Sequence, residues 1–294
     1  MKIGERIREL RISKLMTQAE LAGDHITRNM LSCIENGSAN PSLSTILYIA
    51  GRLNVPAGFL LAEEGDEVVY RKIGNLSNIK RAYTAGDLRG CRSLCIFSCP
   101  EPDDEISLLL ANCDAGIAVE EFWSGRLRSS CRFFDEALGY AEKTVYPTEN
   151  IEATARVYFR YMERISHTLY SDMLDEEKRL DIRSDSPVAA YLDALDALAI
   201  QKNEAVERFL QNADPASFEA AHIRILVMMQ EGDYKGAQKW LLQLLQSETP
   251  LSKVALYSVL GELEVCCRES EDFKGAYNYA NEKIALLEQL LREV

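Results

Sequence analysis

The sharpest pattern in this chain lies in residues 17–40, which predict two short helices joined by a tight turn. Thr17 and Glu20 have the T-x-x-E spacing of a capping box, in which each side chain bonds a free main-chain amide at the start of a helix. Gly23 then permits the chain to turn. The second helix follows at once and ends near Asn36, because Asn36-Gly37 is a helix-stop signal.

The second of these helices has two unlike faces. Its apolar face is expected to carry Met30, Leu31 and Ile34. The polar face carries small or bidentate side chains, namely Thr27, Arg28, Asn29 and Ser32. A short helix with such side chains near its N-terminus fits the major groove of DNA, where it can bond base edges. The segment therefore predicts a DNA-reading helix, with contact to another protein as the alternative use.

The neighbouring sequence extends this pair into a small all-α domain of five helices. The first helix is expected at residues 3–15, with Arg6 and other basic side chains on its outer faces. After Pro41 a fourth helix follows, and a fifth begins at Val55-Pro56. We place this domain at residues 1–65.

Charge is divided unevenly along the 294 residues. The whole chain carries a net charge of −13, yet residues 1–62 hold seven basic and five acidic side chains, a net +2. The remainder holds 26 basic and 41 acidic side chains, a net −15. Since an acidic surface repels phosphate, nucleic acid should meet only the N-terminal domain.

Composition and motifs argue against a membrane protein, a metalloprotein and an enzyme. No apolar run approaches the ~20 residues of a membrane-spanning helix, so a soluble, cytoplasmic protein without a membrane partner is expected. Cys91, Cys95 and Cys99 are spaced like metal ligands, but no C-x-x-C or neighbouring histidine completes a site, and packing of small residues explains them better. The three histidines lack partners at the spacing of a catalytic triad or a zinc site. We predict no catalytic residues, no metal and no cofactor.

The rest of the chain contains an internal repeat. The block G-D-Y-K-G-A at residues 232–237 recurs as E-D-F-K-G-A at 271–276, a shift of 39 residues. G-D-L-R-G-C at 86–91 has the same form, and Gly125 lies 39 residues after Gly86. Each block predicts a turn between two helices, and two further turns are expected near residues 202–203 and 167–176. Small residues share one register after each turn, where paired helices approach closely: Cys91, Ser130, Ala237 and Ala276. Repeats of this kind build an α-solenoid over residues 66–294.

Several blocks of the N-terminal domain resemble the XRE-type helix-turn-helix domain of phage repressors and Cro. They are T-Q-A-E-L-A at 17–22, I-T-R-N-M-L-S-C-I-E-N-G at 26–37, P-S-L at 41–43 and A-G-R-L-N-V-P at 50–56. The resemblance implies that Glu35 is a buried acid paired with Arg11. It also implies a set of DNA-binding residues: Gln18, Thr27, Arg28, Asn29, Ser32, Asn36 and Ser38. Arg28 would bond guanine and Asn29 adenine, while Gln18, Asn36 and Ser38 would lie near phosphate. One residue fewer than usual separates Leu21 from Glu35, which bears on the geometry of the turn.

The repeats resemble tetratricopeptide repeats, in units longer than usual. Together with the N-terminal domain they resemble the RRNPP-type peptide-pheromone regulators of low-GC Gram-positive bacteria. That resemblance implies a homodimer that binds double-stranded DNA at a palindromic operator and holds a short signalling peptide or a protein in its repeats. Candidate ligand-binding residues on the first helices of the units are Asn112, Tyr158, Tyr161 and Tyr191. Two other functions remain open: a protein-binding adaptor with a vestigial helix-turn-helix domain, and a regulator whose repeats serve dimerisation alone.

Overall fold

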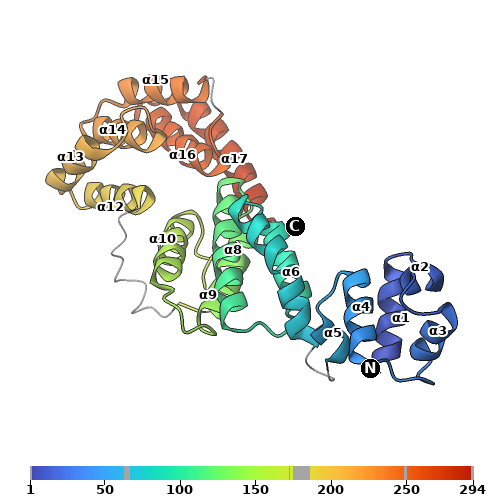
Figure 1. Cartoon of the computed structure of the whole chain (residues 1–294). Coiled ribbons are helices and arrows are strands. Elements are labelled where there is room, and N and C mark those ends of the chain that lie inside the picture. Colours follow the sequence, from blue (N-terminus) through green and yellow to red (C-terminus); the bar gives the residue numbers. More distant parts are fainter. Residues whose placement is uncertain (1, 63–66, 172, 175–185, 248–249, 293–294) are drawn as a thin grey trace. The chain divides into compact units, whose positions relative to one another are not determined.

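The computed structural model describes residues 2–62, 67–171, 173–174, 186–247 and 250–292, and all regular elements in these ranges are α-helices (Figure 1). The first seven helices are α1 (Ile3–Ser13), α2 (Gln18–Ala22), α3 (Arg28–Glu35), α4 (Leu43–Leu53), α5 (Ala57–Leu61), α6 (Glu67–Thr84) and α7 (Leu88–Ser98). The others are α8 (Asp104–Trp123), α9 (Leu127–Ala141), α10 (Glu149–Ile165), α12 (Pro187–Ala199), α13 (Asn203–Asn212), α14 (Phe218–Gln230), α15 (Tyr234–Leu245), α16 (Lys253–Glu269) and α17 (Phe273–Leu290). This confirms the predicted all-α class. No helix in the described ranges is long and apolar enough to cross a membrane.

The chain divides into two compact units, residues 1–106 and residues 107–294. The first unit contains the five predicted N-terminal helices and the α6–α7 hairpin, and the second contains the remaining helices. The domain boundary predicted from the sequence, between residues 65 and 66, lies outside the described residues and stays a prediction.

Helices α1–α5 enclose one buried apolar cluster. Its fully buried members come from all five helices: Ile7, Leu21, Leu31, Ile34, Ile49, Leu53 and Leu60. The predicted cap at Thr17 is present, since its hydroxyl accepts a hydrogen bond from the Glu20 amide. Ser42 caps α4 in the same way, accepting a hydrogen bond from the Thr45 amide. These caps satisfy amides that a helix leaves unpaired at its first turn.

Two details of α1 differ from the sequence prediction. The helix ends at Ser13 instead of Leu15, because Leu15 takes a left-handed conformation (φ 56°) and its side chain is exposed. Arg6 does not face solvent but is 2% exposed. Its Nη1 donates to the carbonyl oxygens of Phe59, Leu60 and Ala62, which are left unpaired at the end of α5. Burial of Arg6 therefore follows from a helix end that lies more than fifty residues away in the sequence.

Three of the predicted repeat turns share one geometry. Asp87, Asp233 and Asp272 cap the second helix of their hairpins, each accepting a hydrogen bond of 2.9 Å from the amide of the glycine three residues on. The glycine before the first two aspartates is left-handed, and Glu271 takes the same conformation before Asp272. The small residues of the shared register are also as predicted: Cys91, Ser130 and Ala237 are fully buried, and Ala276 on the last helix is half-buried.

The middle of the repeat region is less regular. The turn predicted at residues 202–203 is confirmed, because α12 ends at Ala199 and α13 begins at Asn203. The turn predicted at residues 167–176 falls partly outside the described residues. Within the second unit, α10 contacts α9 and α12, α12 contacts α14, and α15 contacts α16. The unit is therefore a stack of helical hairpins, each packed on the next.

Candidate functional site

Helix α3 presents its first turn to solvent. The Thr27 hydroxyl caps the helix by accepting a hydrogen bond of 3.1 Å from the Met30 amide. Arg28 and Asn29 are exposed directly after this cap, whereas Leu31 and Ile34 are buried in the core. The exposed first turn of α3 is thus held in place by the buried Leu31 and Ile34 and by the Thr27 cap.

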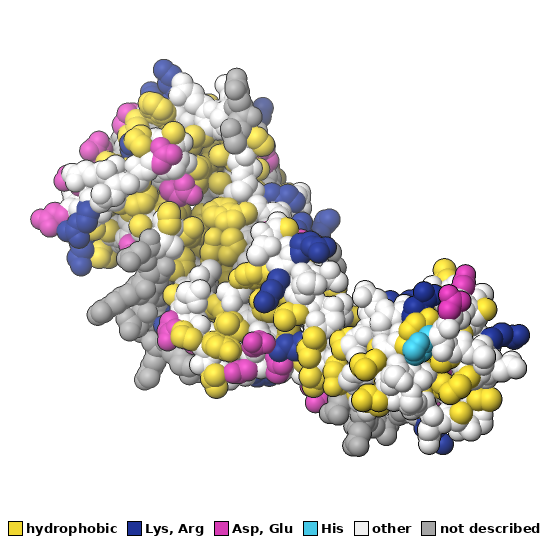
Figure 2. Space-filling model, viewed as in Figure 1, with side chains coloured by type: hydrophobic (Ala, Val, Ile, Leu, Met, Phe, Trp, Pro, Cys, Tyr) yellow, Lys and Arg dark blue, Asp and Glu magenta, His cyan; other side chains and the backbone are white. Residues whose placement is uncertain are grey.

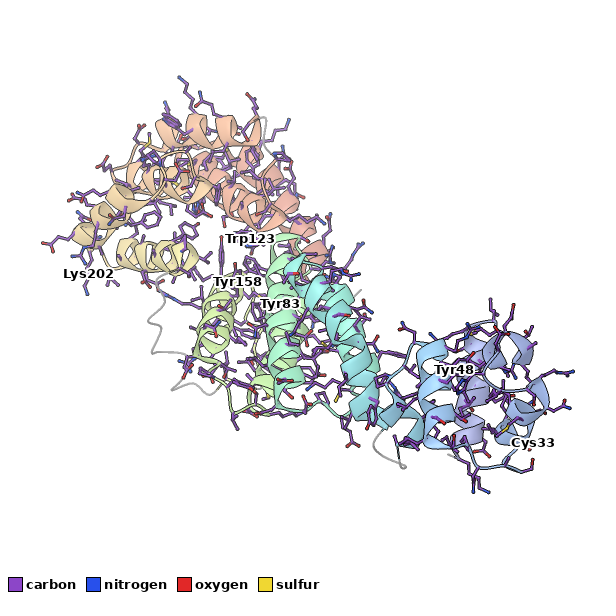
Figure 3. All side chains as sticks on the ribbon, in the orientation of Figure 1. Cys33, Tyr48, Tyr83, Trp123, Tyr158 and Lys202 are labelled. Atoms are coloured by element: carbon purple, nitrogen blue, oxygen red, sulfur yellow. The ribbon has the colours of Figure 1, made fainter. Side chains whose placement is uncertain are left out.

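The other residues of α3 have mixed environments. Ser32 is half-buried, and Cys33 is exposed on the same helix (Figure 3). Met30, predicted on the apolar face, is instead 42% exposed. It belongs to the first turn of the helix, which extends beyond the buried cluster.

A buried charged network holds α3 against α1 and α2. The Arg11 guanidinium donates from Nε to Glu35 Oε1 at 2.7 Å and from Nη2 to Oε2 at 2.9 Å. This confirms the predicted Arg11–Glu35 pair. Burial alone raises the pKa of Glu35, but hydrogen bonds from Arg11 and Gln18 outweigh it, and the net pKa is lowered. The carboxylate is therefore held in its charged form.

Three residues predicted near phosphate make local contacts. Gln18 donates from Nε2 to Glu35 Oε2 at 2.9 Å, so one of its N–H groups belongs to the network around that carboxylate. Asn36 and Ser38 are both exposed, and Asn36 Oδ1 accepts a hydrogen bond from the Ser38 amide at 3.1 Å. These contacts order the turn after α3. The DNA-binding role of all seven residues stays a prediction.

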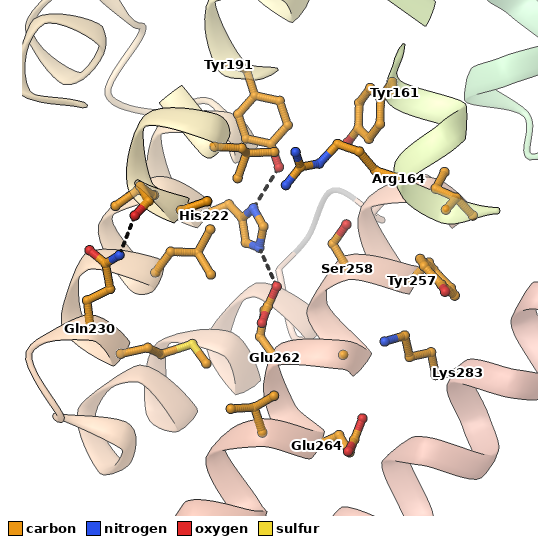
Figure 4. Close-up of a pocket in the computed structure, with 18 of the residues that line it drawn as sticks. Tyr161, Arg164, Tyr191, His222, Gln230, Tyr257, Ser258, Glu262, Glu264 and Lys283 are labelled. Atoms are coloured by element: carbon orange, nitrogen blue, oxygen red, sulfur yellow. Dashed lines mark hydrogen bonds and ion pairs between the residues drawn. The ribbon is translucent and has the colours of Figure 1, made fainter. Parts of the chain in front are cut away.

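A second candidate site is a cavity of about 590 Å³ in the repeat unit (Figure 4). Helices α10, α12, α14, α15, α16 and α17 supply its walls, with Tyr161, Tyr191, His222, Glu262 and Lys283 among the lining side chains. Figure 2 shows hydrophobic side chains gathered in a hollow of this unit. The cavity thus combines apolar walls with a few polar groups, as ligand pockets do.

A chain of aromatic side chains crosses the cavity wall. Tyr191 Oη and His222 Nδ1 are 2.7 Å apart, and the rings of Tyr161 and Tyr191 have centroids 6.0 Å apart. Burial raises the pKa of Tyr161 to about 12, and it raises the pKa of Tyr191 as well. Both hydroxyls therefore remain neutral hydrogen-bonding groups at physiological pH.

The structure brings together two of the four predicted ligand-binding residues. Tyr161 and Tyr191 line the cavity, and Tyr158 and Asn112 do not. Tyr158 is buried among aromatic rings and its hydroxyl accepts a hydrogen bond from Trp123 Nε1 at 3.2 Å (Figure 3). Asn112 donates from Nδ2 to the carbonyl oxygen of Leu108, one turn earlier in α8. His222, Glu262 and Lys283 were not predicted from the sequence, because these side chains meet only when the α14–α15 and α16–α17 hairpins stack.

The arginines of α10 connect neighbouring helices. Arg160 pairs with Asp193 and Asp196, and Arg164 Nη1 lies 2.6 Å from Asp196 Oδ1. Arg156 pairs with Glu152 one turn away. The pairs made by Arg160 and Arg164 tie α10 to α12 beside the cavity.

The cysteines of α7 have the environment of packed small residues. Cys91, Cys95 and Cys99 are buried, and burial, with the neighbouring Cys91 thiol, raises the pKa of Cys95. A raised pKa disfavours the thiolate, which is the form that binds metals. Within the described residues, no cluster of side chains could hold a metal ion.

Comparison with known proteins finds a family match for the segment that contains α3. Residues 7–60 match the profile of the family described as Helix-turn-helix. A segment of 65 residues is 37% identical to the immunity repressor protein of Bacillus phage phi105, covering 22% of this chain and 45% of that protein. The chain therefore matches less than half the length of this curated relative.

Solved structures align along almost the whole chain, but only loosely. Bacillus thuringiensis PlcR in complex with the peptide PapR7 and DNA aligns over 98% of this chain and 96% of its own, with 14% identity and a TM-score of 0.24. ComR from S. thermophilus, with DNA and its signalling peptide ComS, aligns over 97% and 99%, with 16% identity and a TM-score of 0.23. The pheromone receptor Rgg2 of Streptococcus dysgalactiae aligns over 97% and 99%, with 14% identity and a TM-score of 0.20. Such scores do not define the fold of this chain. The sequence matches are more informative: residues 7–60 match the helix-turn-helix family, and 65 residues of the chain are similar to a phage immunity repressor.

Proposed function

We propose that this protein is a sequence-specific, DNA-binding transcription regulator whose helical repeats dimerise and bind a regulatory peptide. The observation that carries the proposal is the outer face of α3, where Arg28 and Asn29 are exposed beyond a capped and anchored helix start. These residues lie within residues 7–60, which match the helix-turn-helix family. The protein acts by binding, in the cytoplasm, and not by catalysis.

The side chains of α3 suit direct reading of base pairs. A guanidinium at Arg28 can bond O6 and N7 of guanine, and the Asn29 amide can pair with adenine. Each such pair contributes about 1–3 kcal/mol of discrimination against a wrong base. Thr27 and Ser32 add hydroxyl groups on the same edge of the helix. The net charge of +2 in residues 1–62 lets this domain, and not the acidic remainder, approach phosphate.

Dimerisation follows from the geometry of DNA and is supported by the last helix. Two DNA-binding domains that contact half-sites about one helical turn apart are related by two-fold symmetry, which a homodimer provides. Helix α17 exposes Phe273, Tyr277 and Ile284 at 69%, 68% and 56%, and their spacing places them on one face. The end of a helical array normally has a polar outer face. We assign this apolar face to a second copy of the chain.

The cavity beside Tyr161 and Tyr191 is the proposed peptide site. Its volume of about 590 Å³ falls within the range of ligand pockets, roughly 300–1,000 Å³. Two buried tyrosine hydroxyls and a histidine supply the few polar groups that orient a ligand in such a site.

Selection of bound sequences from random duplex DNA by the full-length protein tests the proposal. We expect an inverted repeat with two half-sites, which reports both sequence reading and dimerisation. Arg28→Ala should weaken binding to the selected site about tenfold or more and relax the preference at one base pair of each half-site.

The matched control is Arg81→Ala, which removes an equal charge from an exposed position on α6. This control should bind the selected site almost as the wild type does. Recovery of no common sequence, or equal weakening by both variants, would contradict the regulator proposal.

A further inference from the structure

We infer that the repeat cavity recognises a positively charged nitrogen of its ligand, through Glu262 and the neighbouring His222. The inference rests on the proposed peptide-binding function and specifies the chemistry of the peptide. It predicts a basic peptide, whose ammonium or guanidinium group enters this cavity.

The first observation is a buried histidine with an unused nitrogen that faces the cavity. His222 on α14 is 2% exposed, and its Nδ1 bonds to Tyr191 Oη at 2.7 Å. Its Nε2 has no hydrogen-bond partner in the described part of the chain. The carboxylate oxygen Oε1 of Glu262 lies 3.6 Å from Nε2, which is beyond hydrogen-bond distance (Figure 4). A buried polar atom without a partner is costly, so a ligand that supplies one gains binding energy.

The second observation is that Glu262 has little to neutralise it. Among the described residues, its only ionic contact is the long one to His222, and its side chain is 24% exposed. The other carboxylate in the lining, Glu264, pairs with Arg268 at 3.0 Å. Glu262 is therefore the carboxylate of this cavity that remains open to a ligand.

The surroundings add negative potential. The charges of Glu219 and Glu262 both contribute to the raised pKa of Tyr191, after burial and the neighbouring Tyr161. Residues beyond the N-terminal 62 carry a net charge of −15. Aromatic faces of Tyr161 and Tyr191 in the wall also favour a cation.

The two basic side chains of the cavity are already engaged. Arg164 pairs with Asp196, and the ammonium of Lys283 lies 5.1 Å from the ring centroid of Tyr257. Lys283 stands on α17, across the cavity from the end formed by His222 and Glu262 (Figure 4). A ligand nitrogen with several hydrogens can bond the Glu262 carboxylate and His222 Nε2 together, which an acidic or apolar group cannot do.

The test is enrichment of random heptapeptides on the full-length protein, in one pool with blocked termini and one with free amino termini. We expect lysine or arginine to be enriched in the blocked pool if the cation is a side chain. Enrichment in the free pool alone, with no preference for lysine or arginine, would assign the cation to the amino terminus. Either result supports recognition of a cationic nitrogen.

Variants then place the recognition at Glu262. Glu262→Gln should raise the Kd of the enriched peptide about tenfold or more, as for loss of a hydrogen bond to a charged group. Replacing the peptide's lysine by norleucine should weaken binding to the wild type by a similar factor and have little effect on the variant. Glu269→Gln, which changes an exposed carboxylate on the same helix outside the cavity lining, is the matched control and should retain wild-type affinity.

Other outcomes distinguish failure of the cation-binding inference from failure of the proposed peptide-binding function. Enrichment of acidic peptides, lost in Lys283→Gln, would overturn the assignment to Glu262 and keep the peptide receptor. Enrichment of no peptide by a folded protein would overturn both. Equal affinity of Glu262→Gln and wild type for a basic peptide would place the peptide's cation elsewhere.

Discussion

Helix α3 and the repeat cavity place their proposed binding groups differently. On α3, the side chains proposed to contact DNA are exposed, and the charged groups that fix the helix in the domain are buried. In the repeat cavity, the groups proposed to contact the ligand are themselves buried. Arg28 and Asn29 are exposed to solvent at the start of α3, while Glu35 at the end of the helix is fixed by hydrogen bonds from Arg11 and Gln18. In the cavity, Tyr191 and His222 bond each other directly. Side chains that bind DNA must project from the protein surface, because the duplex is too large to be enclosed by the domain. A pocket for a small ligand needs enclosure.

This contrast predicts different responses to mutation. Changes at the tip of α3 should alter binding and leave stability intact, because no core contact is lost. Changes in the network under α3 should alter stability first, and binding as a consequence. In the cavity the two effects are harder to separate, since the same side chains form the wall and contact the ligand.

The largest effect is expected from Glu35→Ala. Removing this carboxylate leaves the Arg11 guanidinium, whose side chain is 12% exposed, without its partner. Breaking a buried ion pair from one side costs about 3 kcal/mol or more. We expect the free energy of opening of α1–α3 to fall by about that amount, measured by native-state hydrogen exchange of their amides.

The control for this change is Glu9→Ala, which removes an exposed carboxylate from α1. It should change the exchange of the same amides by less than about 0.5 kcal/mol. If both variants behave alike, Glu35 does not anchor α3, and the contrast between a buried network and an exposed tip is wrong.

A smaller loss is expected from Gly4→Ala, which tests how closely α1 approaches α3. A Cβ at Gly4 would lie 2.0 Å from the carbonyl oxygen of Ile34, so the two helices must move apart. Overpacking of this kind costs about 1–3 kcal/mol. Gly51→Ala on α4 is the matched control, because a Cβ there meets nothing within 4 Å. It should stabilise the helix by about 0.5–1 kcal/mol, since alanine favours helix over glycine. Equal exchange in the two variants would refute the close approach.

These features differ in how far the sequence could predict them. The caps at Thr17 and Thr27 and the repeat turns at Asp87 and Asp233 depend on residues a few positions apart, so local patterns identify them. Arg6 was wrongly predicted to be on an outer face, because its hydrogen-bond partners at the end of α5 are more than fifty residues away in the sequence.

The two sites show the same limit of prediction. Helix α3 is one continuous segment with a motif, and its exposed Arg28 and Asn29 could be named from the sequence, although the exposure of Met30 could not. The cavity joins six helices from α10 to α17, and only the tyrosines on the expected inner helices could be named from the sequence. His222 and Glu262 carry no local signal, since each acquires its chemistry from the other's position.

The smallest expected effect is the pH dependence of the stability that the Arg11–Glu35 pair gives to α3. Its sign follows from the lowered pKa of Glu35. A carboxyl group with a lowered pKa in the folded state contributes stability that is complete above its unfolded pKa, about 4.3, and is lost as pH falls through the folded pKa. Exchange of the α3 amides, corrected for its intrinsic rate, should therefore be steady from pH 7 to about 5 and accelerate at lower pH. Glu35→Gln should lower the starting stability and remove this part of the acid response. An unchanged acid response in that variant would mean that another carboxylate anchors α3. The buried Tyr161, with its pKa raised to about 12, responds in the opposite direction, because its contribution is lost only as pH rises.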